Sequence, residues 1–403
     1  MIVELHLLQN FSPSCLNRDD TNSPKDCEFG SFRRARISSQ CIKRTIRQHF
    51  ARAELLEADH LARRSKRLIA EVAQKLTESG RPEDQASALV KAALAGVKLK
   101  AGDDNETQYL LFLGRREIAA LAKLVDQHWD TLVEVAEKQS KDESPDEEGS
   151  EKVSSRKKKK AAKATVPAEI TDQIKRCLDG GKAADLALFG RMVADQPDLN
   201  REAACQVAHA ISTNRVSMEM DYYTAVDDLK ERSHEAGAGM IGTVEFNSAC
   251  FYRYANIDFQ QLVENLQGDT DLALKTVEAF VRASVEAIPT GKQNSMAAQN
   301  PPSLVFAVVR KAGFWSLANA FERPIVPDRR DDGLSLVGKS IKALDRYWKR
   351  LGDVYGADGI LAAAACKVDE QPEFEALKPS EKKNVDQVVS CVLKALANGG
   401  KSS

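Results

Sequence analysis

The stretches Val3-Glu4-Leu5-His6-Leu7 and Ser303-Leu304-Val305-Phe306-Ala307-Val308-Val309 decide the fold, because both predict strands of one protein core. The first alternates apolar and polar residues, which is typical of a half-buried strand, and the second is apolar throughout, which is typical of a buried strand. Aromatic and β-branched residues predict further strands over 243–246 and 250–254. With a helix after the first strand and another over 269–288, the order is βαββαβ. This order predicts an α+β protein of the split βαβ, or ferredoxin-like, plan.

The helix that follows the first strand combines an apolar stripe with basic residues. Ser38 or Ser39 is a candidate N-cap, and Ile42, Ile46 and Phe50 recur every four residues, so we expect them to face the core. Between Ser31 and Ala53 the chain has seven basic residues and no acidic residue; the seven are Arg33, Arg34, Arg36, Lys43, Arg44, Arg47 and Arg52.

Composition limits the possible classes of protein. The chain has 403 residues and a net charge of -1, so it has room for two or three domains and is not basic throughout. No apolar run is long enough to span a bilayer, and residues 1–6 lack the features of a signal peptide, so we expect a cytoplasmic protein. Eight scattered cysteines without a C-x-x-C pair predict reduced thiols and no structural zinc.

Two segments interrupt the regular pattern. Residues 138–163 begin acidic and end basic within an otherwise helical region, and with almost no large apolar side chains they predict a mobile loop. Residues 216–242 contain a polar, aromatic run and a glycine-rich run, which together favour a long hairpin or arm. Helical patterns occupy 202–211, 334–347 and 382–397.

Several ordered stretches resemble one family. They are residues 12–20 (SPSCLNRDD), 33–40 (RRARISSQ), 221–229 (DYYTAVDDL) and 251–257 (FYRYANI). Together they are similar to the CasC family, which forms the CRISPR RNA-binding backbone of the type I-E surveillance complex called Cascade.

This resemblance implies a fold, a domain organisation and a set of partners. The fold is a modified RRM-like palm with a helical fingers insertion and a protruding thumb hairpin. It implies a palm over 1–57, fingers over 58–204, the end of a palm helix over 205–215, a thumb over 216–249, and the rest of the palm with C-terminal helices over 250–403. About six copies polymerise on one CRISPR RNA and present it for pairing with a target DNA strand. The further partners are the large subunit, the small subunits, the subunits that cap the guide ends, and a recruited helicase-nuclease.

The resemblance also assigns roles to individual residues. A guide of any sequence must be held by its phosphates and riboses, which suits basic and polar side chains. The expected RNA contacts are Arg18, Lys25, Ser38, Gln40, Lys43, Arg44 and Arg47. The expected wedge residues, which displace one base at regular intervals, are Met192, Tyr223, Thr224 and Ile241. The expected contacts to target DNA are Lys157, Lys158, Lys159, Lys160 and Lys163.

Other readings of the same residues stay open. The basic helix face and the lysine run are also compatible with simple solvation, and Met192, Ile241 and Tyr223 with ordinary packing. Asp19-Asp20 or Asp227-Asp228 would suit a Mg²⁺-dependent backbone endoribonuclease, and a general single-stranded nucleic-acid-binding protein is a further alternative. We expect no catalysis, no metal and no cofactor, and we expect His6 and His209 to be buried or hydrogen-bonded rather than catalytic.

Overall fold

The computed structural model describes residues 1–102, 104–142, 166–193, 196–225, 240–326 and 333–399. The chain divides into two compact units. The first unit contains 1–55, 205–261 and 271–403, and the second contains 56–204 and 262–270. No helix within the described ranges is both long and apolar enough to cross a membrane.

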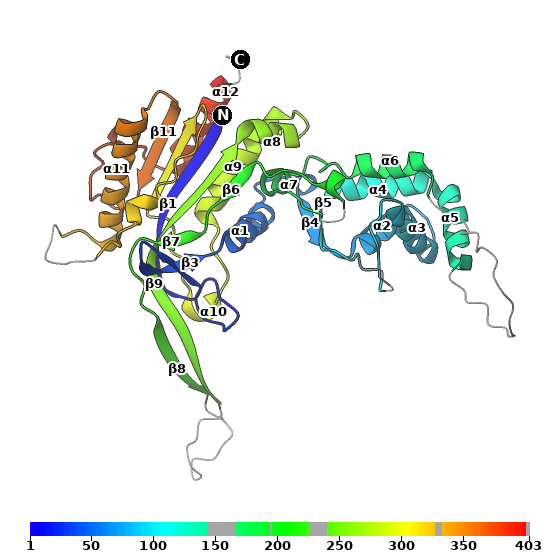
Figure 1. Cartoon of the computed structure of the whole chain (residues 1–403), viewed down its shortest axis with the longest axis horizontal. Helices are drawn as coiled ribbons and strands as arrows, with labels where there is room; N and C mark the ends of the chain where they lie inside the picture. The colour runs from blue at the N-terminus through cyan, green and yellow to red at the C-terminus, as the bar shows by residue number, and fades with distance from the viewer. Residues whose placement is uncertain (103, 143–165, 194–195, 226–239, 327–332, 400–403) are drawn as a thin grey trace, which may run out of the picture. The chain divides into compact units, whose positions relative to one another are not determined.

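The first unit is built on an antiparallel sheet, which confirms the α+β class (Figure 1). Its main path runs in the order β11-β10-β1-β9-β7-β3-β2, and β6 and β8 pair with β9 outside that path. The strands are β1 (Ile2–Ser14), β2 (Asp26–Phe29), β3 (Phe32–Ile37), β6 (Cys205–Val207), β7 (Ala210–Ser212), β8 (Glu219–Ala225), β9 (Met240–Asp258), β10 (Leu304–Arg310) and β11 (Ile360–Lys367).

Helices cover this sheet on both faces. They are α1 (Ser39–Arg52), α9 (Thr270–Glu286), α10 (Gln293–Met296), α11 (Leu336–Tyr355) and α12 (Val385–Gly399), with 3-10 turns at Ala318–Phe321 and Lys378–Ser380. The predicted helices over 269–288, 334–347 and 382–397 correspond to α9, α11 and α12.

The first strand is buried on both sides, not half-buried as its alternation predicts. Leu5 and Leu7 lie with Ile42 and Ile46 of α1, whereas Leu8 belongs to the core that α11 covers. The polar residues of the alternation, Glu4 and His6, are buried as well. A pattern of period two therefore identified the strand but could not show that the second face is also covered.

The buried polar residues of β1 have polar partners inside the core. His6 Nδ1 lies 2.9 Å from the Tyr252 hydroxyl, and burial, with a smaller contribution from Arg310, lowers the pKa of His6 to about 3. Glu4 accepts hydrogen bonds from Tyr254 Oη and from the backbone N–H of Trp315, and lies 3.4 Å from Arg310 Nε. His6 is therefore buried and hydrogen-bonded, as expected.

The second unit is mainly helical. Its helices are α2 (Leu68–Glu78), α3 (Glu83–Gly96), α4 (Arg115–Gln127), α5 (Trp129–Asp142), α6 (Ala168–Cys177) and α7 (Ala184–Phe189), with 3-10 turns at Ala58–His60 and Pro197–Leu199. One two-stranded sheet joins β4 (Ala62–Ser65) to β5 (Leu111–Gly114). The chain returns to this unit in α8 (Phe259–Asn265).

The helical prediction for 202–211, and with it the helix end assigned to 205–215, is wrong. Cys205 pairs with Ile257 and Ile211 pairs with Tyr252, so this segment forms β6 and β7 beside β9. Its local composition favours a helix, but pairing with a strand about 50 residues later decides the conformation, because tertiary context overrides a weak local preference.

Candidate nucleic-acid interface

Helix α1 has the predicted register. Ile42, Ile46 and Phe50 are buried, so the basic residues lie on the other sides of the helix. Arg44 and Gln40 are exposed, and Lys43 and Arg47 are half-buried. Ser38 is the N-cap, because its Oγ accepts a hydrogen bond from the Cys41 N–H.

The loop before β2 is attached to the start of this helix. Asn17 Oδ1 accepts a 2.8 Å hydrogen bond from the Ser38 N–H, and the Asn17 carbonyl accepts one from the Lys25 N–H. Asn17 therefore joins the segments that contain Arg18, Lys25 and the helix cap. An asparagine in a polar loop does not by itself indicate that it joins two segments, so sequence reasoning missed Asn17.

Arg18 and Arg44 line one open, polar groove of about 350 Å³. The groove runs between the loop 16–22, the first turns of α1 and the short segment Thr290–Gly291 after α9. Gly291 packs so tightly that a Cβ there would overlap the carbonyl oxygen of Leu16. The side of the groove that Thr290 and Gly291 form was not predicted, although the Pro289-Thr290-Gly291 sequence is a turn signal.

The electrostatic surroundings of nearby thiols show where positive charge collects. Burial raises the pKa of the Cys41 thiol, and the cations of Arg44 and Lys25 act against that increase. Burial likewise raises the pKa of Cys15, while Arg18 and Lys292 oppose it. Four cations from three segments therefore act on the two thiols, while the carboxylates of Asp19 and Glu245 act in the opposite direction on Cys15.

Part of the basic run lies elsewhere. Arg34 is fully buried, and its guanidinium donates hydrogen bonds to the carbonyls of Ser212, Thr213, Phe321 and Glu322. Arg33 pairs with Asp26. The count of seven basic residues therefore overstates the cations that α1 and its approach present to solvent.

The predicted arm is a β-hairpin in its described part. Strand β8 pairs with β9 from Glu219↔Phe246 to Ala225↔Met240, so Tyr223 lies opposite Gly242 and Thr224 opposite Ile241. Tyr223 is 41% exposed, and Gly242 leaves room for its ring, because a Cβ at 242 would overlap it. This pairing places three of the four predicted wedge residues next to one another along one hairpin.

Met192, the fourth predicted wedge residue, is 85% exposed and so is not a core residue. Its neighbours are fixed: Arg191 exchanges two backbone hydrogen bonds with Arg201, and the Val193 N–H donates to Asn200 Oδ1 at 2.6 Å. The unit thus holds a flexible apolar side chain in solvent on a well-anchored segment.

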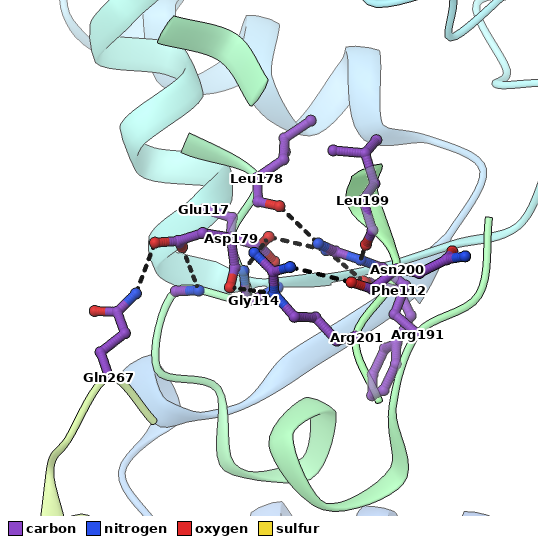
Figure 2. A network of polar contacts seen from close by, with 12 residues as sticks. Phe112, Gly114, Glu117, Leu178, Asp179, Arg191, Leu199, Asn200, Arg201 and Gln267 are labelled. Carbon is purple, nitrogen blue, oxygen red and sulfur yellow. Dashed lines mark hydrogen bonds and ion pairs between the residues drawn. The ribbon is translucent and has the colours of Figure 1, made fainter. Parts of the chain in front are cut away.

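Figure 2 shows the buried guanidinium of Arg191, the residue that precedes Met192 in the chain. Arg191 donates to the Glu117 carboxylate at 2.8 Å and to the carbonyls of Phe112, Leu178 and Leu199. Glu117 also accepts from the N–H groups of Gly114 and Gly180. Arg191 therefore has a structural role, and its neighbour Met192 is the exposed residue of the two.

The remaining predicted residues are placed as follows. Lys157, Lys158, Lys159, Lys160 and Lys163 lie outside the described residues, as does Asp227-Asp228. His209 is exposed and its Nδ1 lies 3.2 Å from Arg36, so it is not a core residue.

Asp19 has a local structural role. Its Oδ1 accepts hydrogen bonds from the Thr21 N–H, the Thr21 hydroxyl and the Ser23 N–H, and these bonds hold the pKa of Asp19 below its usual value. Within the described ranges, no three His, Cys, Asp or Glu residues lie close enough together to hold a metal ion.

Comparison with known proteins identifies the family. Residues 3–391 match the family of CT1975-like proteins. A chain of a solved structure described as a CRISPR RNA-guided surveillance complex, pre-nicking, is 30% identical, with a TM-score of 0.79, and the match covers 98% of this chain and 100% of that chain. A chain of another CRISPR RNA-guided surveillance complex is 28% identical, with a TM-score of 0.70 and the same coverage. A comparison with curated proteins gives no match. Because the family match spans nearly the whole sequence, this chain belongs to the CT1975-like proteins, the CasC-like family that its motifs resemble.

Proposed function

We propose that this protein is a non-catalytic, CRISPR RNA-binding backbone subunit of a type I-E Cascade surveillance complex. The observation that carries the proposal is the groove in which Arg18 and Arg44 converge beside the capped start of α1. Membership of the CasC-like family and the similarity to chains of CRISPR RNA-guided surveillance complexes support it.

The groove suits the backbone of an RNA rather than its bases. Its lining is polar and cationic and contains no aromatic side chain on which a base would stack. Phosphate contacts fix the position of a strand without reading its sequence. We therefore assign Arg18, Lys25, Ser38, Gln40, Lys43, Arg44 and Arg47 to the guide phosphates and riboses.

The hairpin and Met192 supply a different contact. A base that leaves its stack exposes an aromatic face, which an apolar or aromatic side chain covers. The exposure of Met192 and Tyr223, and the pairing of Thr224 with Ile241, support the role of these four residues as a wedge that displaces guide bases at regular intervals.

The same proposal includes the assembly. In it, the first unit is an RRM-like palm that carries the thumb hairpin, and the second unit is the helical fingers. Copies of the chain polymerise along the guide, with other Cascade subunits at its ends and a helicase-nuclease recruited afterwards. The lysines at 157–160 and 163 contact the target DNA strand, which the guide recognises by base pairing.

RNA that co-purifies with the native assembly tests the proposal. We expect a transcript of defined length with repeat-derived ends, protected from nuclease at intervals of about six nucleotides, which is the spacing that the resemblance to the CasC family implies. Shortening the hairpin between Tyr223 and Ile241 removes the periodic protection while the sheet stays folded. An assembly without bound RNA, or an unchanged protection interval after the deletion, contradicts the proposal.

Incubation of the RNA-bound assembly with Mg²⁺ tests the absence of catalysis. We expect intact RNA, because the Asp19 carboxylate already closes its own turn. Periodic cuts that disappear in Asp19→Ala or Asp20→Ala would instead support the endoribonuclease.

A further inference from the structure

A second cationic surface lies in the second unit, apart from every residue assigned above. It consists of the exposed residues Arg64, Lys66, Lys98 and Lys100 around the side chain of Leu110, which is 56% exposed. We call these five residues the β4 surface.

Backbone hydrogen bonds bring the three segments of the β4 surface together. The Thr107 N–H donates to the Lys66 carbonyl at 2.8 Å, and the next N–H, of Gln108, donates to the Lys100 carbonyl at 3.0 Å. Lys66 and Lys100 therefore flank the same two residues. The segment then continues through Leu110 into β5, which pairs with β4.

The side chains of this surface point away from the core of the unit. Leu99, between Lys98 and Lys100, is buried in that core with Leu111, and Thr107 is buried as well. Lys66, Lys98 and Lys100 are exposed, so these lysines lie on the outside of the unit, away from that core. Arg64 lies over the ring of Phe112, with Cζ 5.2 Å from its centroid.

Three acidic residues near the β4 surface, among those that the structure describes, have contacts of their own. Glu71 accepts from Arg63 at 3.0 Å, and Glu106 lies 3.6 Å from Arg67. The Asp104 carboxylate accepts the Glu106 N–H within its own turn. In the described part of the chain, Lys66, Lys98 and Lys100 have no acidic partner.

We propose that the β4 surface is a second nucleic-acid site, which holds the phosphodiester backbone of a strand other than the one in the Arg18–Arg44 groove. Three unpaired lysines beside a fixed arginine give the charge density that phosphates require. A protein partner fits less well, because protein interfaces are depleted in lysine and enriched in aromatic residues, and this surface exposes one leucine.

Charge removal on the full chain tests the site. The variant Lys66→Gln/Lys98→Gln/Lys100→Gln is compared with Lys75→Gln/Lys91→Gln/Lys123→Gln, which removes three lysine charges from other elements of the same unit. Binding of fluorescent single-stranded DNA, single-stranded RNA and duplex DNA of equal length is measured against salt concentration, and the three probes distinguish the possible sources of the phosphates.

We expect the first variant to bind its preferred probe about tenfold more weakly and to reduce the slope of log K against log[salt] by about two units for a single strand. The matched variant should change both quantities much less. Arg18→Ala/Arg44→Ala should leave the affinity of the β4 surface for its preferred probe unchanged, because the two sites hold different strands and act independently. Equal effects of the two lysine variants, or no effect of the first, overturn the proposal and leave an acidic protein as the candidate partner.

A measurement on the unaltered chain covers the case in which a variant fails to fold. Ultraviolet crosslinking to each probe should yield crosslinked peptides within 63–67 and 98–110. Crosslinks confined to the groove residues would also refute the second site. Because this readout concerns the second unit alone, it is distinguishable from a failure of RNA binding in the groove.

Discussion

Arg44 and Arg191 have the same guanidinium group in opposite surroundings. Arg44 is exposed at the edge of a groove, whereas Arg191 is buried and bonded to a carboxylate and three carbonyls. Arg34 belongs with Arg191, although in sequence it lies only ten residues from Arg44. Arginines of this chain therefore either fix its backbone inside the protein or lie exposed at a groove, and their position in a basic run does not tell which.

The largest expected effect follows from removing the buried guanidinium. Arg191→Met leaves Glu117 buried without its charged partner, which should lower the free energy of unfolding of the second unit by about 3–5 kcal/mol. Amide hydrogen exchange over 112–117 and 178–201 measures the loss. Arg44→Met is the matched control and should change it by less than about 0.5 kcal/mol. Equal protection in both variants would remove the distinction between the two arginines.

A second effect compares a buried imidazole with an exposed one. The pKa of His6 is about 3 in the folded chain, below its ordinary value of 6.5, so the unfolded chain binds the extra proton between these values. The contribution of His6 to the free energy of unfolding is therefore fully present above pH 6.5. It decreases as the pH falls from 6.5 towards 3, by about 1.4 kcal/mol per pH unit. The stability difference between the unaltered chain and His6→Gln should narrow by about 2 kcal/mol from pH 6.5 to pH 5.

The control for this prediction is His209→Gln. The exposed His209 also has a lowered pKa, because of partial burial and the cations of Arg36 and Lys25. The difference in free energy of unfolding between the unaltered chain and His209→Gln, measured by urea unfolding at pH 6.5 and pH 5, should therefore change in the same direction but by less. A larger change for His209 than for His6 would mean that burial of His6 does not control the acid sensitivity.

A third effect concerns the groove itself. Arg18→Ala/Arg44→Ala should weaken RNA binding about tenfold, equally for unrelated sequences, and should reduce the salt slope by about 1.4 units, because in the proposed function each arginine contacts a phosphate. Filter binding at several salt concentrations measures both quantities. Arg52→Ala, at the far end of the same helix, is the matched control. A loss that depends on RNA sequence would argue for base contacts instead.

The smallest effect concerns the cap of α1. Ser38→Ala removes the acceptor of the Cys41 N–H and should lower the free energy of unfolding by about 1 kcal/mol. Ser38→Asp should restore most of that loss, because aspartate also caps helices well. Urea unfolding of the three proteins tests this order, and an Asp variant as unstable as the Ala variant would contradict the role of Ser38 as a cap.

Sequence reasoning succeeded where neighbouring residues determine the structure. The stripe of Ile42, Ile46 and Phe50 and the cap at Ser38 depend on spacings within one helix, and the structure confirms both. The strand predicted over 303–309 is β10, and the arm predicted over 216–242 contains the paired strands β8 and β9. The two strands predicted over 243–246 and 250–254 are instead parts of one continuous strand, β9.

Features that depend on distant contacts could not be predicted. The carbonyls of Phe321 and Glu322, which accept from Arg34, lie almost 290 residues later in the sequence. The β-conformation of Cys205–Val207 depends on β9, and the third wall of the groove on a turn that follows another helix. Each requires knowledge of which distant segment lies alongside, and a single sequence does not contain it.

Strand β9 has one more consequence. It runs without interruption from Asp258, beside the first residues of β1, to Met240 in the hairpin, and the same 19 residues belong to both the sheet centre and the arm. Since side chains alternate along a strand, inserting a single residue that joins the ladder between the hairpin and Ser248 would exchange the two sides of the hairpin relative to the sheet. The pairing of β9 with β1 already shifts register on either side of Ser248, so this is where the chain can adjust which way Tyr223 and its neighbours face.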